Sequence, residues 1–482
     1  MMPRKKLLTL ESMNQSVRGV VVPILGSLSV RAVEIQREIE EGIHKPFGKI
    51  TACHLGDNQS MGQRPVTFLR QVAVLCTYPD LLDSPHFPED AKRRARALMK
   101  ELDGGSVGSY NLFMYIGKTL PHKIANFIKR RDGGVPCDPR NIIVSSGASQ
   151  AIVSVLSLVV NNEEALKTGI MVSVPHYTVY VDAIALCEAV KVQYKLEEEN
   201  GWSVNVTNIR TSLHEARKHC HPKVLCVINP GNPTGHVLSR EIMEEVIHLA
   251  SEENLLLFAD EVYQENVFGP GAAFHSFKKV LFEMGPRYSE RVQLVSFNSI
   301  SKGISAECGL RSAYIEFVNI DPSVFEILHS LKSFNEPPVL GALMMDVMLD
   351  PPQPGDQSYE TYIAEKRDLL NNLAEKAHLT EEILNSAPGF RCNPIHGALY
   401  AFPSIQIPET AVRLAQDRGL EPDVFFCHLL LEDTGILLSA GSSFGQVETY
   451  HFRLSLLPPI EELKCILEKI TEFHGRFMAE YS

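Results

Sequence analysis

The stretch VLCVINPGNPTG, residues 224–235, joins an apolar run to an unusually rigid loop. The run VLCVI is apolar throughout, which is typical of a strand buried on both faces. The loop carries two Asn-Pro pairs, of which the second is Asn232-Pro233. Proline restricts the residue before it to extended conformations, so Pro233 presets the direction of the Asn232 side chain. The stretch therefore predicts a buried strand that ends in a loop built to hold one amide still.

Outward from this stretch, short apolar runs alternate with helical patterns. The expected strands are NIIVSS (141–146), GIMVSV (169–174), LLLFAD (255–260), VQLVSF (292–297) and SAYIEF (312–317). The expected helices between them are GASQAIVSVLSLVV (147–160) and SREIMEEVIHLASEEN (239–254). This alternation predicts an α/β fold with a mostly parallel central sheet covered by helices. Ligands of such sheets bind beyond the carboxyl ends of the strands.

The last third of the chain has a different pattern. A long helix is expected over 358–387, a hairpin over 389–403 and another helix over 423–435. Helices followed by short strands are typical of an α+β unit. We therefore expect a large domain over 79–339 and a smaller α+β domain made from 1–78 together with 340–482.

Composition narrows the class of protein. The chain has 482 residues and a formal net charge of −12, which argues against a nucleic-acid-binding protein. No apolar run approaches the ~20 residues needed to span a bilayer. The ten cysteines include no CxxC pair, so we expect reduced thiols and no metal site. These features favour the cytosol, with the mitochondrial matrix as the alternative.

Chemically capable side chains follow the predicted strands in order. Asp260 ends the run LLLFAD, with Tyr263 shortly after it, and Lys302 and Arg311 follow VQLVSF. A buried lysine amine can attack an aldehyde. A buried carboxylate such as Asp260 can keep a pyridine nitrogen protonated, which turns the ring into an electron sink. Tyr263, like the amide of Asn232, can bond the phenolic oxygen of such a ring.

A phosphate site is also indicated. Arg311 offers a planar fork of donors and Ser299 a hydroxyl. Ala148 and Ser149 stand at the predicted start of a helix, where backbone N–H groups and the helix dipole favour anions. An aldehyde, a pyridine nitrogen, a phenolic oxygen and a phosphate together describe pyridoxal 5′-phosphate.

Longer strings carry a family resemblance. The segments NPGNPTG, ADEVY and SISKG resemble motifs of the fold-type I aminotransferases, which depend on pyridoxal 5′-phosphate. The strings FADEVYQENV, ECGLRSAY and YHFRLSLLPP are similar to those of the alanine aminotransferase (glutamate–pyruvate transaminase) family. The resemblance extends over roughly residues 30–482. It implies the reaction L-alanine + 2-oxoglutarate = pyruvate + L-glutamate by a ping-pong mechanism.

The resemblance also implies roles for single residues. Lys302 would be the Schiff-base lysine, Asp260 the partner of the pyridine nitrogen, and Asn232 the partner of the phenolic oxygen. Tyr177 would lie against the cofactor ring.

Further residues would complete the site. Arg453 would grip the substrate α-carboxylate and Gly56 would lie near it. Tyr110 would reach the phosphate of the neighbouring subunit's cofactor, which implies a homodimer.

Other functions stay open at this point. The chain could be another aminotransferase or lyase of the same cofactor class, of aromatic or kynurenine type. It could also be a catalytically weak relative that acts as an interaction protein. The segment 110–121 is bulkier than in the family and contains Pro121, so we expect the following helix to begin at or after that proline.

Overall fold

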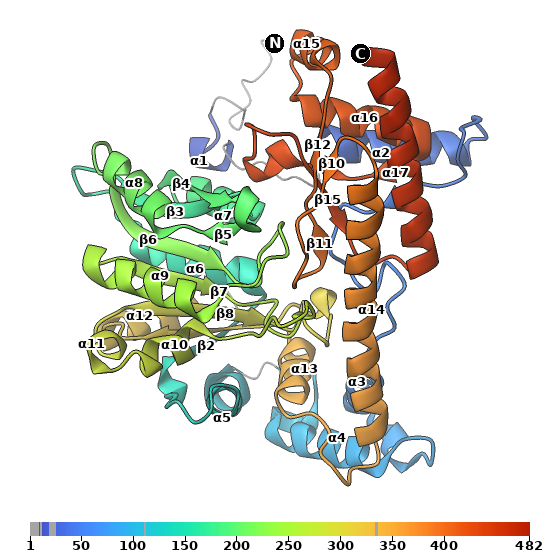
Figure 1. The fold of residues 1–482 in the computed structure, drawn as a ribbon. Coiled ribbons are helices and arrows are strands. Elements are labelled where there is room, and N and C mark those ends of the chain that lie inside the picture. The colour runs from blue at the N-terminus through green and yellow to red at the C-terminus, as the bar shows by residue number, and fades with distance from the viewer. Residues whose placement is uncertain (1–8, 10–11, 19–25, 110–111, 333–335) are drawn as a thin grey trace, which may run out of the picture.

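The structure is a computed structural model of the whole chain. It describes every residue except 1–8, 10–11, 19–25, 110–111 and 333–335. The fold is α/β, as the sequence predicts, with a mostly parallel central sheet (Figure 1).

The central sheet has eight strands in the order β2-β9-β8-β7-β6-β3-β4-β5. In this order, the adjacent strands β8, β7, β6, β3 and β4 run parallel to one another. Strand β9 runs antiparallel to both β2 and β8, and β5 runs antiparallel to β4. The strands are β2 (Ile142–Ser145), β3 (Thr168–Val174), β4 (Val190–Glu197), β5 (Ser203–Val204), β6 (His221–Ile228), β7 (Leu256–Asp260), β8 (Leu294–Ser299) and β9 (Ala313–Val318). The strands predicted from apolar runs are thereby confirmed.

Helices cover both faces of this sheet, which explains why its inner strands are apolar throughout. One face packs against α6 (Ala148–Val159), α7 (Thr178–Leu186) and α12 (Pro322–Lys332). The other packs against α8 (Val206–Ala216), α9 (Arg240–Glu253) and α10 (Phe277–Glu283). In β7, for example, Phe258 lies in the first core and its neighbours Leu257 and Ala259 in the second.

A separate helical core adjoins the β2 end of the sheet (Figure 1). Its helices are α3 (Thr67–Thr77), α4 (Glu89–Glu101), α5 (Leu120–Arg131) and α13 (Val339–Leu349). The expected start at or after Pro121 is wrong, because a π-helix over Leu112–Thr119 leads directly into α5. Proline fits there because the second helical position, Pro121, needs no backbone N–H bond within α5.

The C-terminal elements build small sheets beside long helices. These helices are α14 (Tyr359–Ser386), α15 (Glu409–Asp417), α16 (Pro422–Thr434) and α17 (Ile460–Tyr481). The small strands are β10 (Phe390–Arg391), β11 (Tyr400–Ala401), β12 (Ser404–Ile405), β13 (Ile436–Leu437), β14 (Ser439–Ala440) and β15 (Phe452–Ser455).

The N-terminal segment joins this part of the fold. Strand β1 (Thr51–Ala52) pairs in parallel with β13, and α2 (Ser27–Glu40) packs against α16. The proposed division at 78/79 and 339/340 stays a prediction. No helix within the described part of the chain is long and apolar enough to cross a membrane.

Candidate active site

The carboxyl ends of three adjacent strands bring the predicted residues together. Register pairs Ile228, the last residue of β6, with Asp260, the last residue of β7. Asp260 in turn pairs with Phe297 near the end of β8. The Asn232 loop, Asp260 and Lys302 therefore emerge at the same edge of the sheet, as expected for a ligand site of this architecture.

Lys302 contacts the N-terminal segment. Its Nζ donates a 2.6 Å hydrogen bond to the carbonyl oxygen of Gly56. A Cβ on Gly56 would stand 3.1 Å from that Nζ and only 2.0 Å from the hydroxyl of Tyr400. Glycine is required here because these two polar groups approach the backbone too closely for any side chain.

Asp260 is a buried carboxyl group, 2% exposed. It accepts hydrogen bonds from the Tyr180 hydroxyl at 3.2 Å and the Val262 N–H at 3.4 Å. Burial raises its pKa to about 6, although both hydrogen bonds favour the ionised form. Among the described residues no cation pairs with it.

The two asparagines of the tandem Asn-Pro loop have different partners. Asn229 Oδ1 accepts from the Leu238 N–H at 2.9 Å and closes the loop. Asn232, 5% exposed, reaches toward the site, where its Nδ2 lies 3.5 Å from the Tyr263 hydroxyl. The loop therefore places the second amide between Tyr263 and Arg453.

Arg453, on β15, is buried beside that amide and is held in a fixed orientation. Its guanidinium donates to Asn232 Oδ1 at 3.1 Å and to the His54 carbonyl oxygen at 2.6 Å. Burial, aided by the charge of Arg453, lowers the pKa of His54 to about 4, so His54 is neutral at neutral pH. Among the described residues Arg453 forms no ion pair with a carboxylate, and its buried Nε has no hydrogen-bond partner. Such a guanidinium is well suited to a carboxylate ligand.

The phosphate-site candidates cluster at the start of α6. Gly147 precedes this helix with φ 90°, and Ala148 and Ser149 are its first residues. A Cβ on Gly147 would stand 2.2 Å from Arg311 Nη2, so the guanidinium lies directly against the helix start. The Oγ of Ser299 accepts from the Ser301 N–H at 3.0 Å.

Arg311 itself is held by neutral groups. Its Nη1 donates to the Cys308 carbonyl oxygen at 2.8 Å and lies 3.5 Å from Ser301 Oγ. No side chain caps α6. A cation without a carboxylate partner in the described chain, placed at a free helix start, fits an anionic group such as a phosphate.

A cavity of about 520 Å³ adjoins these groups. Its walls include Gly56, Tyr177, Lys302, Tyr400 and Arg453. Tyr177 precedes α7, and burial raises its pKa to about 12. The structure thus brings the predicted residues to one place, except Tyr110, which lies outside the described residues.

Sequence reasoning missed Tyr400, which is 3% exposed and lines the same cavity. It lies in the predicted hairpin segment GALYAFP, where an aromatic residue is usually interpreted as a core residue. Only the pairing of β11 with β15, which sets Tyr400 opposite Ser455, brings it near Arg453.

These residues fit pyridoxal 5′-phosphate. The buried Asp260 carboxyl suits a protonated pyridine nitrogen, and Arg311 with the α6 start suits a phosphate. The Lys302 amine borders a cavity large enough for a small ligand. In the described part of the chain, no group of three or more His, Cys, Asp or Glu side chains could hold a metal ion.

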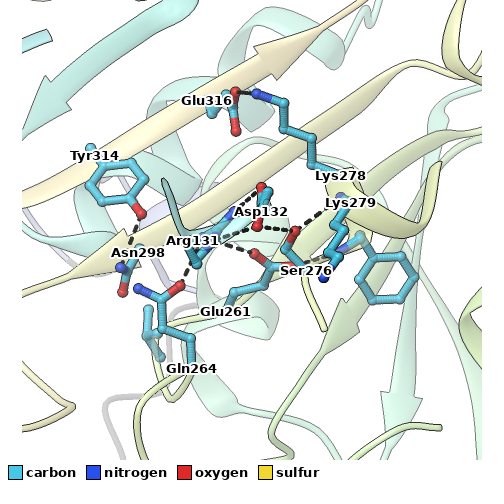
Figure 2. A network of polar contacts seen from close by, with 12 residues as sticks. Arg131, Asp132, Glu261, Gln264, Ser276, Lys278, Lys279, Asn298, Tyr314 and Glu316 are labelled. Atoms are coloured by element: carbon cyan, nitrogen blue, oxygen red, sulfur yellow. Dashed lines mark hydrogen bonds and ion pairs between the residues drawn. The ribbon is translucent and has the colours of Figure 1, made fainter. Parts of the chain in front are cut away.

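Glu261, the residue after Asp260, belongs to a buried ionic network (Figure 2). Arg131 binds Asp132 through two 2.8 Å hydrogen bonds, donates to Gln264 and lies 3.8 Å from Glu261. Glu261 Oε1 also accepts from the Phe277 N–H at 2.7 Å. Burial raises the pKa of Glu261 to about 8 although Arg131 opposes the shift. The network connects the end of α5, the end of β7 and the start of α10.

A buried ion pair between Lys278 and Glu316 of β9 adjoins this network. In the same region Asn298 donates a 3.1 Å hydrogen bond to the Tyr314 hydroxyl.

Comparison with known proteins agrees with this chemistry. The family model "Aminotransferase class I and II" matches residues 79–470. The chain is 52% identical to alanine aminotransferase 2 of Xenopus laevis, over 99% of this chain and 88% of that protein. It is 50% identical to alanine aminotransferase 1 of Bos taurus, over 99% and 97%.

Solved structures agree on the fold. Alanine aminotransferase from Pyrococcus furiosus superposes with a TM-score of 0.71 at 21% identity, covering 97% of this chain and all of that one. A cofactor-compatible site, the fold and the family match lead to one conclusion. The chain belongs to the class I and II aminotransferases, enzymes that use pyridoxal 5′-phosphate to exchange amino groups between amino acids and 2-oxo acids.

Proposed function

We propose that this chain is an alanine aminotransferase, which exchanges the amino group between L-alanine and 2-oxoglutarate by a ping-pong mechanism. The observation that carries the proposal is the identity of 52% to an alanine aminotransferase over 99% of the chain. The geometry supports it, because the side chains that transamination needs lie at one edge of the sheet and around one cavity.

Residues at the strand ends would hold the cofactor. Arg311, Ser299 and the start of α6 at Ala148 and Ser149 would bind the phosphate. The Asp260 carboxylate would bind the pyridine nitrogen.

The ring itself would have three further neighbours. Asn232 and Tyr263 would bond the phenolic oxygen, and Tyr177 would lie against the ring. When bound, pyridoxal 5′-phosphate supplies an aldehyde that takes up the amino group and a ring that delocalises the electron pair left on the substrate Cα.

Lys302 would move the proton. Its Nζ is the amine that borders the cavity, and it is held by the Gly56 carbonyl oxygen. In the neutral form this amine can remove the proton from the substrate Cα and return it on the other side of the exchange as a general acid. We propose Lys302 as the covalent attachment point of the cofactor for the same reason.

Arg453 would set the orientation of the substrate. A planar fork binds a carboxylate through two parallel hydrogen bonds and so fixes which substituent of Cα faces the base. Its contacts with Asn232 and His54 fix the fork before substrate arrives.

We further propose a homodimer in the cytosol, with the mitochondrial matrix as the alternative compartment. The homodimer rests on the family resemblance, in which Tyr110 reaches the neighbouring subunit's cofactor. Sedimentation of the purified protein tests the dimer, and cell fractionation tests the compartment.

A panel of amino donors tests the substrate. L-alanine, L-aspartate, L-phenylalanine and L-kynurenine would each be offered with 2-oxoglutarate and with pyruvate. We expect alanine with 2-oxoglutarate to have the highest kcat/KM, and parallel double-reciprocal lines for the ping-pong order. A higher kcat/KM with an aromatic donor would move the chain to another aminotransferase type, and no turnover with any donor would favour an interaction protein.

Lys302→Ala separates catalysis from folding. This variant should keep the thermal stability of the fold but lose covalent cofactor attachment and nearly all transamination. Mass spectrometry after borohydride reduction identifies the attachment site. Turnover near that of the wild type would exclude Lys302 from its assigned role.

A further inference from the structure

Tyr400 is a residue of the cavity wall to which neither the sequence motifs nor the proposed function assigns a role. It lies on β11, is 3% exposed, and has Ser455 of β15 as its register partner. A buried tyrosine is by default a core residue, and Tyr400 does pack within the core of the C-terminal elements. Its ring and its hydroxyl, however, both face groups that the reaction uses.

The ring faces the substrate-binding arginine. The guanidinium carbon of Arg453 lies 4.1 Å from the centre of the Tyr400 ring and 4.7 Å from the centre of the Phe444 ring. Such distances give a favourable cation–π interaction, which is stronger where water is excluded. Two aromatic rings therefore restrict the guanidinium, in addition to its hydrogen bonds.

The hydroxyl approaches the same backbone position as the proposed base. The position of a Cβ on Gly56 is 2.0 Å from the Tyr400 hydroxyl and 3.1 Å from Lys302 Nζ, so both polar groups meet over the same backbone atom. The Tyr263 ring lies edge-on to that of Tyr400, with the two ring centres 6.4 Å apart. The Tyr400 side chain is thus next to Tyr263 on one side and approaches Gly56, as Lys302 does, on the other.

The electrostatics agree with this placement. Burial alone would raise the pKa of Tyr400, but the charges of Lys302 and Arg453, with the hydrogen bond from Tyr263, outweigh it. The pKa of Tyr400 therefore lies below its usual value. The pKa of Tyr263 is raised instead, chiefly by burial.

We propose that Tyr400 is a positioning residue of the transamination site that acts through two other residues: its ring fixes the Arg453 guanidinium and its hydroxyl fixes the Lys302 amine. The inference rests on the proposed function, because it gives Arg453 and Lys302 the roles stated there. A single side chain would in this way set the distance between the group that holds the substrate α-carboxylate and the group that moves the α-proton.

Two substitutions separate the ring from the hydroxyl. Tyr400→Phe keeps the ring and removes the hydroxyl, whereas Tyr400→Leu removes both. Single-turnover half-reactions of the holoenzyme, measured separately with L-alanine and L-glutamate, give the maximal rate and the half-saturation concentration. Tyr400→Met, which has a longer side chain, replaces the leucine variant if that variant does not fold.

A matched control is Tyr194→Phe. The Tyr194 hydroxyl is buried as well and donates a 2.7 Å hydrogen bond to the Cys226 carbonyl oxygen, but its side chain lies outside the cavity wall. This variant measures the general effect of removing a buried phenol oxygen.

For Tyr400→Phe we expect a maximal rate lowered roughly tenfold, with half-saturation concentrations within about twofold of wild type. For Tyr400→Leu the half-saturation concentrations of both substrates should also rise by roughly fivefold or more. Tyr194→Phe should leave both quantities near those of the wild type.

Three other results would contradict these expectations. An active wild type with Tyr400 variants that match it, or that lower both quantities no more than Tyr194→Phe does, would overturn the inference and leave the proposed function intact. An increase in half-saturation in Tyr400→Phe equal to that in Tyr400→Leu would overturn the division between ring and hydroxyl. A wild type inactive with every donor would contradict the proposed function and, with it, this inference.

Discussion

Asp260 and Glu261 are consecutive carboxyl groups at the end of β7, yet the chain surrounds them in opposite ways. Both are almost completely buried, 2% and 1% exposed, and burial raises the pKa of both. On the site side, Asp260 is bound by one hydroxyl and one backbone N–H. On the other side, Glu261 lies in a network that contains Arg131 (Figure 2).

With the roles proposed above, the difference separates a carboxyl group that serves the chemistry from one that serves the fold. A buried carboxylate is costly unless a cation compensates it. For Glu261 the chain itself provides the Arg131 guanidinium 3.8 Å away, and its raised pKa of about 8 lets the carboxyl also keep a proton, whereas for Asp260 the cation would be the protonated ring nitrogen of the cofactor. Two neighbouring residues of similar chemistry should therefore respond to substitution in different measurable quantities.

The largest contrast is expected in catalysis. Asp260→Ala should lower kcat/KM for alanine by about a thousandfold or more, roughly 4 kcal/mol, because nothing else would keep the ring nitrogen protonated. Glu261→Gln should stay within a few fold of wild type. Steady-state kinetics at saturating cofactor measure both. Recovery of Asp260→Ala with excess cofactor would reduce Asp260 to a binding role.

The next contrast is in stability. Arg131→Met would leave the Asp132 carboxylate buried without the cation that binds it through two hydrogen bonds, which should lower the unfolding free energy by about 3–5 kcal/mol. Denaturant titration measures this change. Arg140→Met is the matched control, because Arg140 is an exposed arginine that also pairs with a nearby aspartate, Asp138. If the two variants lost equal stability, the buried network would contribute no more to the unfolding free energy than an exposed ion pair does.

A smaller effect is expected in the pH dependence of stability. The pKa of Glu261 is raised from 4.5 to about 8 on folding, so the folded protein holds a proton that the unfolded chain releases. The stability that comes from this proton is complete below pH 4.5 and is lost as the pH rises through 8. Glu261→Gln should remove that decline, which for a single group is at most ~1.4 kcal/mol per pH unit.

Asp260 provides a check on this measurement. Its own pKa of about 6 confines its contribution to lower pH, so the window between pH 6 and 8 reports on Glu261. Parallel stability curves for wild type and Glu261→Gln across that window would show that Glu261 is ionised in the folded protein.

The smallest effect concerns the hydroxyl that binds Asp260. Tyr180→Phe removes a 3.2 Å hydrogen bond and leaves the backbone N–H of Val262 in place. A hydrogen bond of this kind contributes about 1 kcal/mol, so kcat/KM should fall less than tenfold. A loss as large as that of Asp260→Ala would mean that Tyr180 itself takes part in the chemistry.

The sequence predicts the parts of this molecule that are determined locally. Asp260 and the Asn232 loop can be placed because a strand end and the loop after it are set by a few neighbouring residues. Strand β4 lies near the sheet edge, and its buried residues alternate with exposed ones, so it lacks the continuous apolar run from which other strands are predicted. The predicted fold class and family are confirmed, while the roles of the single site residues stay predictions.

Contacts between distant segments explain what the sequence could not predict. Tyr400 approaches Arg453 only through the pairing of β11 with β15, and Glu261 meets Arg131 only because α5 ends beside β7. Neither contact leaves a pattern in the neighbouring residues. The helical turn before Pro121 also depends on a contact with a distant segment, because the buried Tyr115 hydroxyl donates a 2.8 Å hydrogen bond to Asp346 of α13.

The pairing of β1 with β13 has a consequence for the order of events on the ribosome. Chains emerge from the N-terminus, and early segments fold as soon as their partners are available. All eight strands of the central sheet are complete at residue 318, but Gly56 belongs to a segment whose strand partner is Ile436–Leu437. Arg453 emerges later still. A nascent chain could therefore fold the sheet that precedes Lys302 well before it could close the cavity around that lysine. The complete cofactor site would then form only near the end of synthesis.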